Sequence, residues 1–331
     1  MKKIVLISLS IILSLILVES LLRFVAIEPW RYIESENPII FELDSSLGWK
    51  AKEGSYLISA SNNTNKKTLM TFGKRSNRLN EYKIEKSDNP AILFIGGSFT
   101  QGWGVNDEET FVSKIQNDYK NYSVYNFGQG GFGGVQSLIM LQKEIDRIKN
   151  TKLVIYGFIE HHEYRNVARS SWLETLSKYS RRGHSKIPKI PYATLDEENN
   201  LKINSPIGYL HLPLRENSSI ITLIEKVYMK QITRKRKKIQ KLATKKIILN
   251  MHEVSKKNNS EFLLVILDWS NQFSNEEYKK FFVNKKINYV DCKISLNEET
   301  LIPGDYHPNA KGHTMYRECI DNFIKDNKLL F

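Results

Sequence analysis

Five short and almost wholly apolar segments constrain this chain more than any other feature. They cover residues 91–95, 123–127, 153–158, 262–269 and 287–290. Helical segments are expected between them, at about residues 108–119 and 135–149. Strands that are apolar on both faces and alternate with helices are typical of a parallel sheet covered on both sides. The sequence therefore predicts an α/β protein with three layers, α/β/α, around a mostly parallel sheet of about five strands.

The N-terminus predicts a membrane segment. Two lysines precede an apolar run over residues 4–27, which would measure roughly 36 Å as a helix and could cross a bilayer core of about 30 Å. Glu19 and Arg23 lie one helical turn apart within it and can pair. An uncleaved anchor is favoured over a cleaved signal peptide because no small-residue cleavage site follows Val18. The positive-inside rule then predicts a single pass through a bacterial inner membrane, with the bulk of the chain on the periplasmic or extracellular side.

Three parts of the chain follow from this pattern. Residues 1–27 are the anchor, and residues 28–89 are polar and rich in turn formers, which predicts a stalk with a few edge strands. Residues 90–331 form the α/β domain. Within that domain, about residues 160–258 are too long for a simple crossover and are expected to form a lid or a substrate-facing subdomain.

The positive charge is local. The chain carries a formal net charge of +13, but residues 226–246 alone contain ten basic residues and no acidic one. No zinc-finger, RNP or basic-zipper spacing is present, so nucleic acid is not an expected partner. The basic stretch predicts a helix whose lysines contact solvent, anionic lipid or an acidic glycan. Its apolar residues are expected to pack inward, and they are Ile224, Val227, Ile232, Ile239 and Leu242.

The cysteines and tryptophans each allow two interpretations. Cys292 and Cys319 are too few for a disulfide-rich scaffold or a zinc ribbon. Two free buried thiols are the default expectation, with a disulfide as the alternative in an oxidising compartment. Trp103, Trp172 and Trp269 are expected in the core, with sugar-stacking platforms as the alternative.

Glycine-rich turns follow two of the predicted strands. Residues 96–102 place Ser98 just before a helix, where its hydroxyl and backbone N–H can face a cleft. A helix cap or a phosphate-binding turn is the alternative. Residues 128–134 contain five glycines in seven positions, a pattern that can bring bare N–H groups close to a ligand oxygen. No Walker lysine or Rossmann acid accompanies these turns.

A third polar loop lies near the C-terminus, at residues 305–309, and contains Asp305 and His307. Asp and His close together in a loop can form an orienting acid and a general base. A serine hydroxyl is weakly reactive until an imidazole accepts its proton. The joint occurrence of this loop and the serine turn therefore favours nucleophilic catalysis over two unrelated surface loops.

Together the three blocks resemble the SGNH hydrolases, also called GDSL-type esterases, and within them the membrane-anchored bacterial envelope proteins. The resemblance runs from about residue 91 to the C-terminus, except for the long insertion, and implies an SGNH or flavodoxin-like sheet. It implies Ser98 as the nucleophile, His307 as its base and Asp305 as the orienting acid. It also implies an oxyanion hole made by the N–H groups of Ser98 and Gly131. Such an esterase or acyltransferase needs no cofactor and no metal.

The sequence departs from the family pattern at two places. Only Tyr306 separates Asp305 from His307, where the family usually has two residues. The Asn that usually supplies a third oxyanion donor is also missing. Aligning the block that ends at Asn166 with the anchored relatives places His161 at its position, so the ring N–H of His161 is expected to be the third donor. The alternative is that Asn166 is the true donor and His161 only packs the loop.

The substrate is inferred from location, with Trp103 and Asn166 as candidate substrate contacts. An anchored serine enzyme facing the envelope is expected to act on O-acetyl or other acyl esters of glycans, by hydrolysis or by acyl transfer. Two other functions stay open. One is a non-catalytic scaffold, and the other is a metal-dependent hydrolase with ligands drawn from a histidine and aspartate set: His161, His162, Asp305, His307 and His313.

Overall fold

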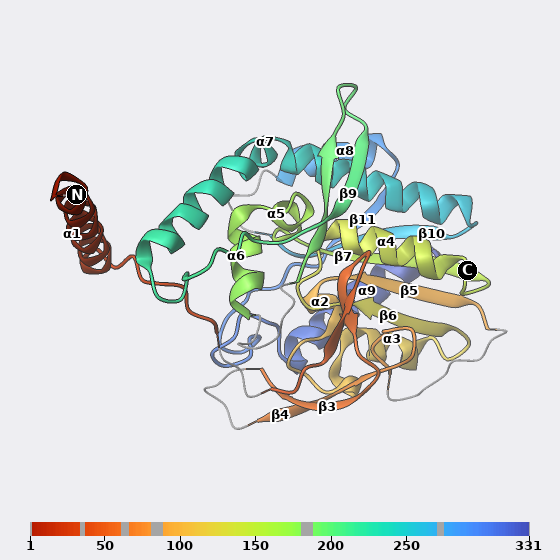
Figure 1. Ribbon diagram of the computed structural model, residues 1–331. Coiled ribbons are helices and arrows are strands. Elements are labelled where there is room, and N and C mark those ends of the chain that lie inside the picture. The colour runs from red at the N-terminus through yellow and green to blue at the C-terminus, as the bar shows by residue number, and fades with distance from the viewer. Residues whose placement is uncertain are drawn as a thin grey trace.

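The computed structural model describes residues 2–33, 37–60, 66–80, 89–179, 188–269 and 275–330. Its centre is a five-stranded sheet in the order β11–β10–β7–β5–β6 (Figure 1), and every neighbouring pair is parallel. The predicted fold class is confirmed. The strands are β5 (Ala91–Gly96), β6 (Ser123–Gly128), β7 (Thr151–Ile159), β10 (Glu261–Asp268) and β11 (Asn288–Asp291).

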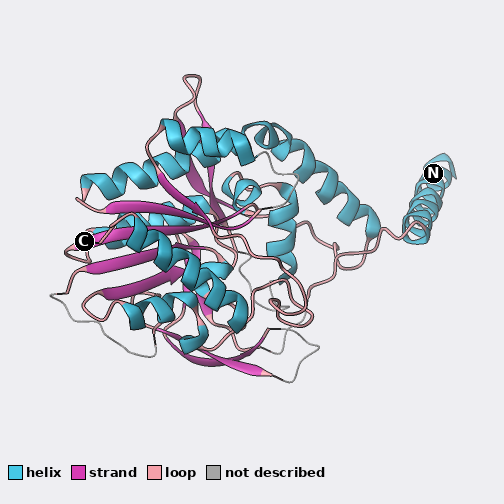
Figure 2. Ribbon diagram, turned by 180° about the vertical axis from the view of Figure 1, so that it is seen from behind, coloured by secondary structure: helices cyan, strands magenta, loops and turns pink. Residues whose placement is uncertain are grey.

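Helices cover both faces of this sheet (Figure 2). On one face, α4 (Gly134–Ile145) and the second half of α7 (Ser219–Lys257) form the larger core with the strands. On the other face, α3 (Phe111–Asp118) and α9 (Ala310–Asp326) form the second core. Side chains alternate between the faces of a strand, so β5 contributes to both cores. This double burial explains why its sequence is apolar without interruption.

The segment before the sheet packs on the domain. It forms two antiparallel hairpins, β1 (Phe41–Asp44) with β2 (Gly48–Ala51), and β3 (Gly54–Ser59) with β4 (Lys67–Phe72). Trp30, Leu47 and Trp49 are buried in the larger core. These side chains are therefore part of the folded domain rather than of an extended stalk, while the boundaries at residues 27 and 89 stay predictions.

The long insertion has its own secondary structure. It begins with α5 (His162–Asn166) and α6 (Ser170–Tyr179), continues with an antiparallel hairpin of β8 (Ile190–Leu195) and β9 (Leu201–Ile207), and ends with α7. The second half of α7 buries Ala243, Ile247 and Met251 in the larger core. That half is the helix that leads from β7 to β10, whereas the first half extends toward α1 (Lys2–Phe24) (Figure 1).

The predicted inward packing of the apolar residues of α7 is wrong. Ile224, Val227 and Ile232 are 49%, 59% and 43% exposed, Leu242 is exposed as well, and Ile239 is half-buried. The opposite stripe of the helix faces the protein, and it includes Thr222, Glu225, Met229 and Thr233. Periodicity shows which residues share a face of a helix, but it does not show which face meets the domain.

The N-terminal helix α1 has 23 residues, and the mean hydropathy of its most apolar window is 2.6. No side chain of this helix is buried. It is long and apolar enough to cross a membrane, although a signal sequence near an N-terminus has the same properties. The predicted pair between Glu19 and Arg23 is confirmed at 2.9 Å.

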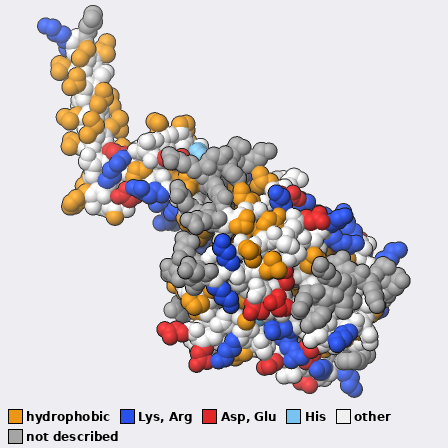
Figure 3. Space-filling model, turned by 90° about the horizontal axis from the view of Figure 1, so that it is seen from below, with side chains coloured by type: hydrophobic (Ala, Val, Ile, Leu, Met, Phe, Trp, Pro, Cys, Tyr) orange, Lys and Arg blue, Asp and Glu red, His pale blue; other side chains and the backbone are white. Residues whose placement is uncertain are grey.

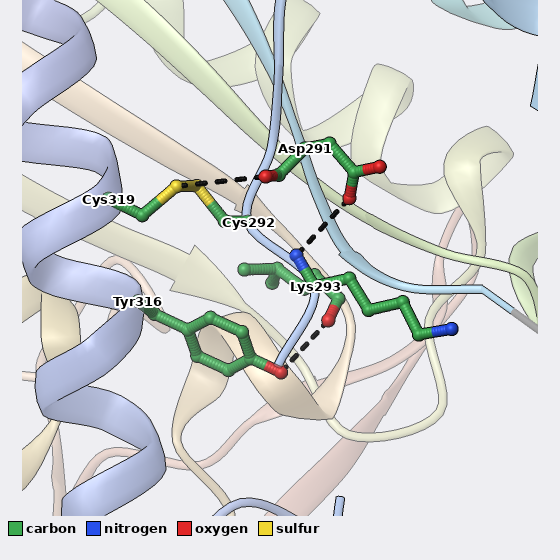
Figure 4. The surroundings of a disulfide bond; sticks show 6 residues. Asp291, Cys292, Lys293, Tyr316 and Cys319 are labelled. Carbon is green, nitrogen blue, oxygen red and sulfur yellow. Dashed lines mark hydrogen bonds between the residues drawn. A yellow bond between two sulfur atoms is a disulfide. The ribbon is translucent and has the colours of Figure 1, made fainter. Parts of the chain in front are cut away.

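The expectation of two free thiols is wrong. Cys292 and Cys319 form a disulfide that joins the end of β11 to α9 (Figure 4). Tyr316 lies one helical turn before Cys319 and donates a hydrogen bond to the carbonyl oxygen of Leu267 at 2.9 Å (Figure 4). The pairing was not predictable because 27 residues separate the cysteines, and only the packing of α9 on the sheet brings them together.

Candidate active site

Ser98 begins α2 (Ser98–Gln101), two residues after the carboxyl end of β5, which lies between β7 and the edge strand β6. The helix packs against the backbone at the end of β6. A Cβ atom at Gly128 would lie 2.7 Å from the backbone carbonyl carbon of Thr100, so only glycine permits this close approach. The side chain of Ser98 is therefore held at the edge of the sheet and is 7% exposed.

A buried arginine supports the other end of this turn. Arg78, which follows β4, donates hydrogen bonds to the carbonyl oxygens of Gln101 at 3.0 Å and Val105 at 2.6 Å, and to that of Gly102. Its charge is matched by Asp107 at 2.9 Å. Because Arg78 is 1% exposed, these contacts fix the chain on the C-terminal side of α2.

The loop that carries Asp305 and His307 is fixed on both sides. The backbone N–H of Ile302 donates to the carbonyl oxygen of His307 at 3.0 Å, and the N–H of Asp305 donates back to Ile302 at 3.0 Å. Beyond the loop, the side chain of Asn309 caps α9 by accepting hydrogen bonds from two N–H groups of its first turn. The loop thus reaches the serine with a defined conformation.

Ser98, His307 and Asp305 are brought together in a chain of hydrogen bonds. The Nε2 atom of His307 lies 2.7 Å from Ser98 Oγ. Its Nδ1 atom is hydrogen-bonded to the Asp305 carboxylate, which also accepts from the backbone N–H of His307 at 2.9 Å. A neutral imidazole in this arrangement donates through Nδ1–H and accepts the serine hydroxyl at Nε2. The single intervening residue, Tyr306, does not prevent the contact.

Trp103 contributes to the same chain. Its indole N–H donates to the second carboxylate oxygen of Asp305 at 3.3 Å, and its ring lies 6.2 Å from that of His307. Burial raises the pKa of Asp305, but the hydrogen bonds and charge of His307, its backbone N–H and Trp103 outweigh it and leave the pKa below its usual value. The carboxylate is therefore ionised at neutral pH. This role of Trp103 was not foreseen from the sequence.

The glycine loop after β6 faces the serine turn between two tryptophans. Gly131 has a positive φ of 80°, and a Cβ there would lie 3.0 Å from Trp49 and 3.3 Å from Trp172. The indole N–H of Trp49 donates to the carbonyl oxygen of Gly130 at 3.0 Å. Within the described ranges, the backbone N–H groups of Ser98 and Gly131 have no hydrogen-bond partner. Both are available to an incoming oxygen.

Trp49 was missed by the sequence interpretation, because it lies on β2 in the segment expected to be a stalk. The occurrence of two tryptophans, Trp30 and Trp49, in an otherwise polar segment was the one available signal. Of the three tryptophans considered, Trp269 is buried in the larger core, as expected by default. Trp172 is also largely buried, and the guanidinium of Arg165 lies 4.4 Å above its ring.

His161 lies at the carboxyl end of β7 with an exposed side chain. Surrounding protein atoms, the charge of Arg165 and the nearby His307 lower its pKa to about 4, while Glu160 opposes the shift. The ring is accessible to solvent, and because its pKa is lowered it is neutral at pH 7 and has one N–H to donate. Its side chain makes no hydrogen bond to any described residue.

Asn166 lies in a different environment. Its side-chain oxygen accepts from the backbone N–H of Val135 at 3.1 Å, and its amide nitrogen donates to Thr244 Oγ1 at 2.9 Å. The residue is 1% exposed. Its polar atoms thus join α4, α5 and α7 within the protein, which favours a supporting position over contact with a substrate.

The remaining histidines of the metal interpretation lie apart. His162 is fully buried, with Nδ1 at 2.7 Å from the hydroxyl of Tyr156. His313 is also fully buried; its Nδ1 accepts from the backbone N–H of Phe111 at 3.2 Å. Over the described part of the chain, no three histidine, cysteine or acidic side chains form a group that could hold a metal ion. The geometry gives the metal-dependent alternative no support.

Similarity to known proteins is found among solved structures. No family model matches the chain, and no curated protein matches it. Among solved structures it is similar to TesA, with a TM-score of 0.44 and 11% identity over 72% of this chain and 99% of that one. It is also similar to a G-D-S-L family lipolytic protein from Veillonella parvula, with a TM-score of 0.39 and 12% identity over 70% and 96% of the two chains.

A third similar structure is an acetyl-xylooligosaccharide esterase from Geobacillus, with a TM-score of 0.37 and 12% identity over 72% and 96% of the chains. At these identities and TM-scores the similarity says nothing of the chemistry, which depends on the residues of the site.

Proposed function

We propose that this protein is a serine esterase or acyltransferase that uses Ser98, His307 and Asp305. The observation that carries the proposal is the 2.7 Å contact between Ser98 Oγ and His307 Nε2, with the Asp305 carboxylate on the other ring nitrogen. A serine needs both a base and an oriented imidazole to become a useful nucleophile. The hydrogen-bonded arrangement of Ser98, His307 and Asp305 also favours an active enzyme over a non-catalytic scaffold.

In this proposal Ser98 Oγ attacks the acyl carbon of the ester, and its proton passes to His307 Nε2. The resulting imidazolium is stabilised by Asp305 through Nδ1–H. His307 then gives the proton to the leaving alcohol as the ester C–O bond breaks, which leaves an acyl group on Ser98. Water or a sugar hydroxyl attacks this acyl group in the second half, again with His307 taking a proton, and Ser98 is regenerated.

Three donors are available for the negative charge that develops on the carbonyl oxygen. The N–H groups of Ser98 and Gly131 lack partners among the described residues, and the neutral ring of His161 supplies the third donor. Backbone donors of this kind are fixed before the substrate arrives, so little reorganisation is needed in the transition state. His161 replaces the family's usual asparagine amide in this role.

We further propose that α1 is an uncleaved anchor and that the domain lies outside the inner membrane. Glu19 accepts hydrogen bonds from the N–H of Ser219 at 2.8 Å and the hydroxyl of Ser218 at 2.9 Å, so the end of α1 is part of the folded protein. Protease added to spheroplasts is expected to digest the chain beyond about residue 27. Full protection of the C-terminus would contradict this orientation.

The substrate class proposed is an acyl ester of an envelope glycan, with O-acetyl as the simplest case. The acetyl-xylooligosaccharide esterase is named for an acetylated oligosaccharide, but the proposal for this chain rests on its proposed membrane location and on its site. The test uses the full chain in detergent micelles, an O-acetylated oligosaccharide and water enriched in oxygen-18. Labelled acetate is expected from hydrolysis, and an acetylated acceptor sugar is expected from transfer. Absence of both products, with p-nitrophenyl acetate also left intact, would contradict the proposal.

A further inference from the structure

The corner where α1 meets α7 exposes apolar side chains outside the membrane helix itself. On α7 these are Ile224, Val227, Tyr228 and Ile232, and Leu214 lies in the preceding loop. We propose that these five residues, here named the docking strip, lie in the outer surface of an anionic phospholipid bilayer and hold the domain against it. The proposal rests on the proposed anchor and goes beyond it, because a tether alone would leave the domain free to swing.

The end of α1 is clamped to the start of α7. Besides its contacts to the two serines, Glu19 accepts from the backbone N–H of Ile220 at 3.2 Å. Arg23 donates to the carbonyl oxygen of Asn217 at 2.8 Å. These bonds place the first turn of α7 at the level of the last turn of α1. If α1 crosses the bilayer, that level is the membrane interface, so the start of α7 lies there too.

A second cluster stiffens the connection between α1 and the domain. The guanidinium of Arg215 lies 3.4 Å above the ring of Trp30 and pairs with Glu225 at 2.9 Å. Trp30 belongs to the chain just after α1, and Glu225 belongs to α7. The side chains of Arg215 and Glu225 are both almost completely buried. The domain is thus oriented relative to the anchor by more than a flexible linker.

The spacing of the docking strip matches one face of a helix. Positions 224, 227, 228 and 232 differ by three, four and eight residues, and residues 220–232 span roughly 18 Å along the axis. Val227 is 59% exposed and Leu214 is 70% exposed. Figure 3 shows hydrophobic side chains on the part of the domain beside the outer end of α1, with basic side chains near them. An apolar face with this position fits an interfacial helix.

The apolar surface continues into a hollow beside the helix. A groove of about 1050 Å³ is lined by Tyr228 and Ile232 of the docking strip and, from other elements, by Leu43, Tyr209 and Leu210. Asp44, Lys189, His211 and Arg236 also line this groove, so acyl chains at the membrane surface would meet a recess next to the strip that combines apolar and charged side chains.

The charge of α7 supports an anionic surface as the partner. Lys230, Arg234, Lys235, Lys237 and Lys238 are exposed, and none of them pairs with a described acid. Farther along the helix, both Lys241 and Lys245 pair with Glu277 of α8 (Asn275–Asn284). Within the same basic stretch, Lys226 pairs with Glu174 at 3.8 Å and Arg236 donates to the carbonyl oxygen of Ala168 at 3.3 Å, so the basic residues that lack a described acid are interspersed with engaged ones. Lysines beside an apolar face are typical of helices that bind anionic lipid.

A second copy of the chain is the other occupant to consider for this face. The bilayer is favoured because the strip is continuous with α1, which already brings lipid to the same level, and because two copies would bring their unpaired lysines together.

The test places an environment-sensitive fluorophore at two matched positions in the full chain. Val227→Cys is labelled in the docking strip, and Val283→Cys is the control on α8. The two valines are 59% and 64% exposed on helices. Glu277 of α8 pairs with Lys241 and Lys245 of α7, which lie 14 and 18 positions after residue 227, or roughly 21 and 27 Å along the helix, so α8 is remote from the docking strip. Cys292 and Cys319 are in the disulfide and stay unlabelled without reductant.

Each labelled protein is incorporated as a single copy into nanodiscs that contain phosphatidylglycerol, phosphatidylcholine and a lipid carrying a spin label near its headgroup. The label at position 227 is expected to be blue-shifted and strongly quenched, and the label at position 283 to be neither. The quenching is expected to weaken in discs of phosphatidylcholine alone and at high salt. Tyr228→Cys provides a second position in the strip if the first variant folds poorly.

Equal and weak quenching at positions 227, 228 and 283 would overturn the proposal. Shielding of position 227 that appears only in concentrated micelles and without lipid quenching would assign the face to a second copy instead. Equal quenching in anionic and neutral discs would refute the part played by charge. Failure of the protein to enter discs would contradict the anchor, and esterase activity is read separately in the same samples.

Discussion

The two ends of α2 differ in how far their polar atoms are already used. On the C-terminal side, the carbonyl oxygens of Gln101 and Val105 are occupied by the buried Arg78. On the N-terminal side, the N–H of Ser98 has no described partner, and its hydroxyl meets only the half-exposed ring of His307. We call the C-terminal side of α2 the supported side, because its polar atoms are already bonded, and the N-terminal side the open side, because it can receive a substrate. Substitutions on the supported side should lower the free energy of unfolding, and substitutions on the open side should lower the catalytic rate.

The largest effect is expected on the open side. Ser98→Ala should lower esterase activity by at least about 10³-fold, the scale of losing a member of such a triad, with no fall in melting temperature. Ser113→Ala is the matched control, because that hydroxyl is also buried and has no partner among the described residues. Activity that survives in Ser98→Ala, or that falls equally in both variants, would contradict this assignment of catalysis to the open side.

The supported side predicts the reverse behaviour. Arg78→Met removes a buried charge, leaves Asp107 without its cation and leaves carbonyl oxygens without their arginine donor, so the free energy of unfolding should fall by about 3–5 kcal/mol. Arg75→Met is the control, since its side chain is 41% exposed and pairs with Glu144 at 3.6 Å, and its effect should stay within about 1 kcal/mol. Denaturant titration compares the two. Similar midpoints would show that Arg78 does not support the turn.

His161 tests the open side without touching the triad. His161→Ala should lower kcat by about 10²- to 10³-fold, equivalent to roughly 3–4 kcal/mol, with a nearly unchanged melting temperature. His161→Asn should recover much of the loss, because an amide restores a donor. Asn166→Ala is the contrasting variant, expected to reduce stability because its contacts to Val135 and Thr244 are lost. A large rate defect in Asn166→Ala beside a silent His161→Ala would reverse the assignment.

The smallest predicted effect, counted per pH unit, is a pH dependence on the supported side. Burial first, and then the charge of Arg78, lower the pKa of His313 from 6.5 to about 3. The unfolded chain therefore binds a proton between these values while the folded chain does not, so stability falls as the pH is lowered from 6.5 toward 3. One such group contributes a slope of about 1.4 kcal/mol per pH unit. His313→Phe should reduce the slope of unfolding free energy against pH by about that amount, and an unchanged slope would contradict it.

The sheet and the central residues of the site were predictable, because both follow from local rules. Strands apolar on both faces indicate a parallel sheet, and in such a sheet the turns after the strands meet at one edge. Ser98, Gly131 and His161 each follow a different strand, and His307 precedes the last helix. Their convergence is therefore a consequence of topology.

The supporting contacts were not predictable, because they come from segments without a periodic pattern. Arg78 and Trp49 lie in the polar part of the chain, and only tertiary packing brings them to α2 and to the glycine loop. The outward face of α7 was missed for a related reason. The spacing of Ile224 and Val227 identifies a face, but its direction depends on where α1 and the sheet lie.

The most direct test of the central claim is covalent labelling of the full chain with a fluorophosphonate, followed by peptide mapping. A nucleophilic serine activated by His307 should carry the adduct on Ser98, and prior incubation with an ester substrate should slow the labelling. His307→Ala should abolish it while Ser113→Ala leaves it unchanged. An unmodified Ser98, or an adduct that forms equally well without His307, would contradict the proposed mechanism.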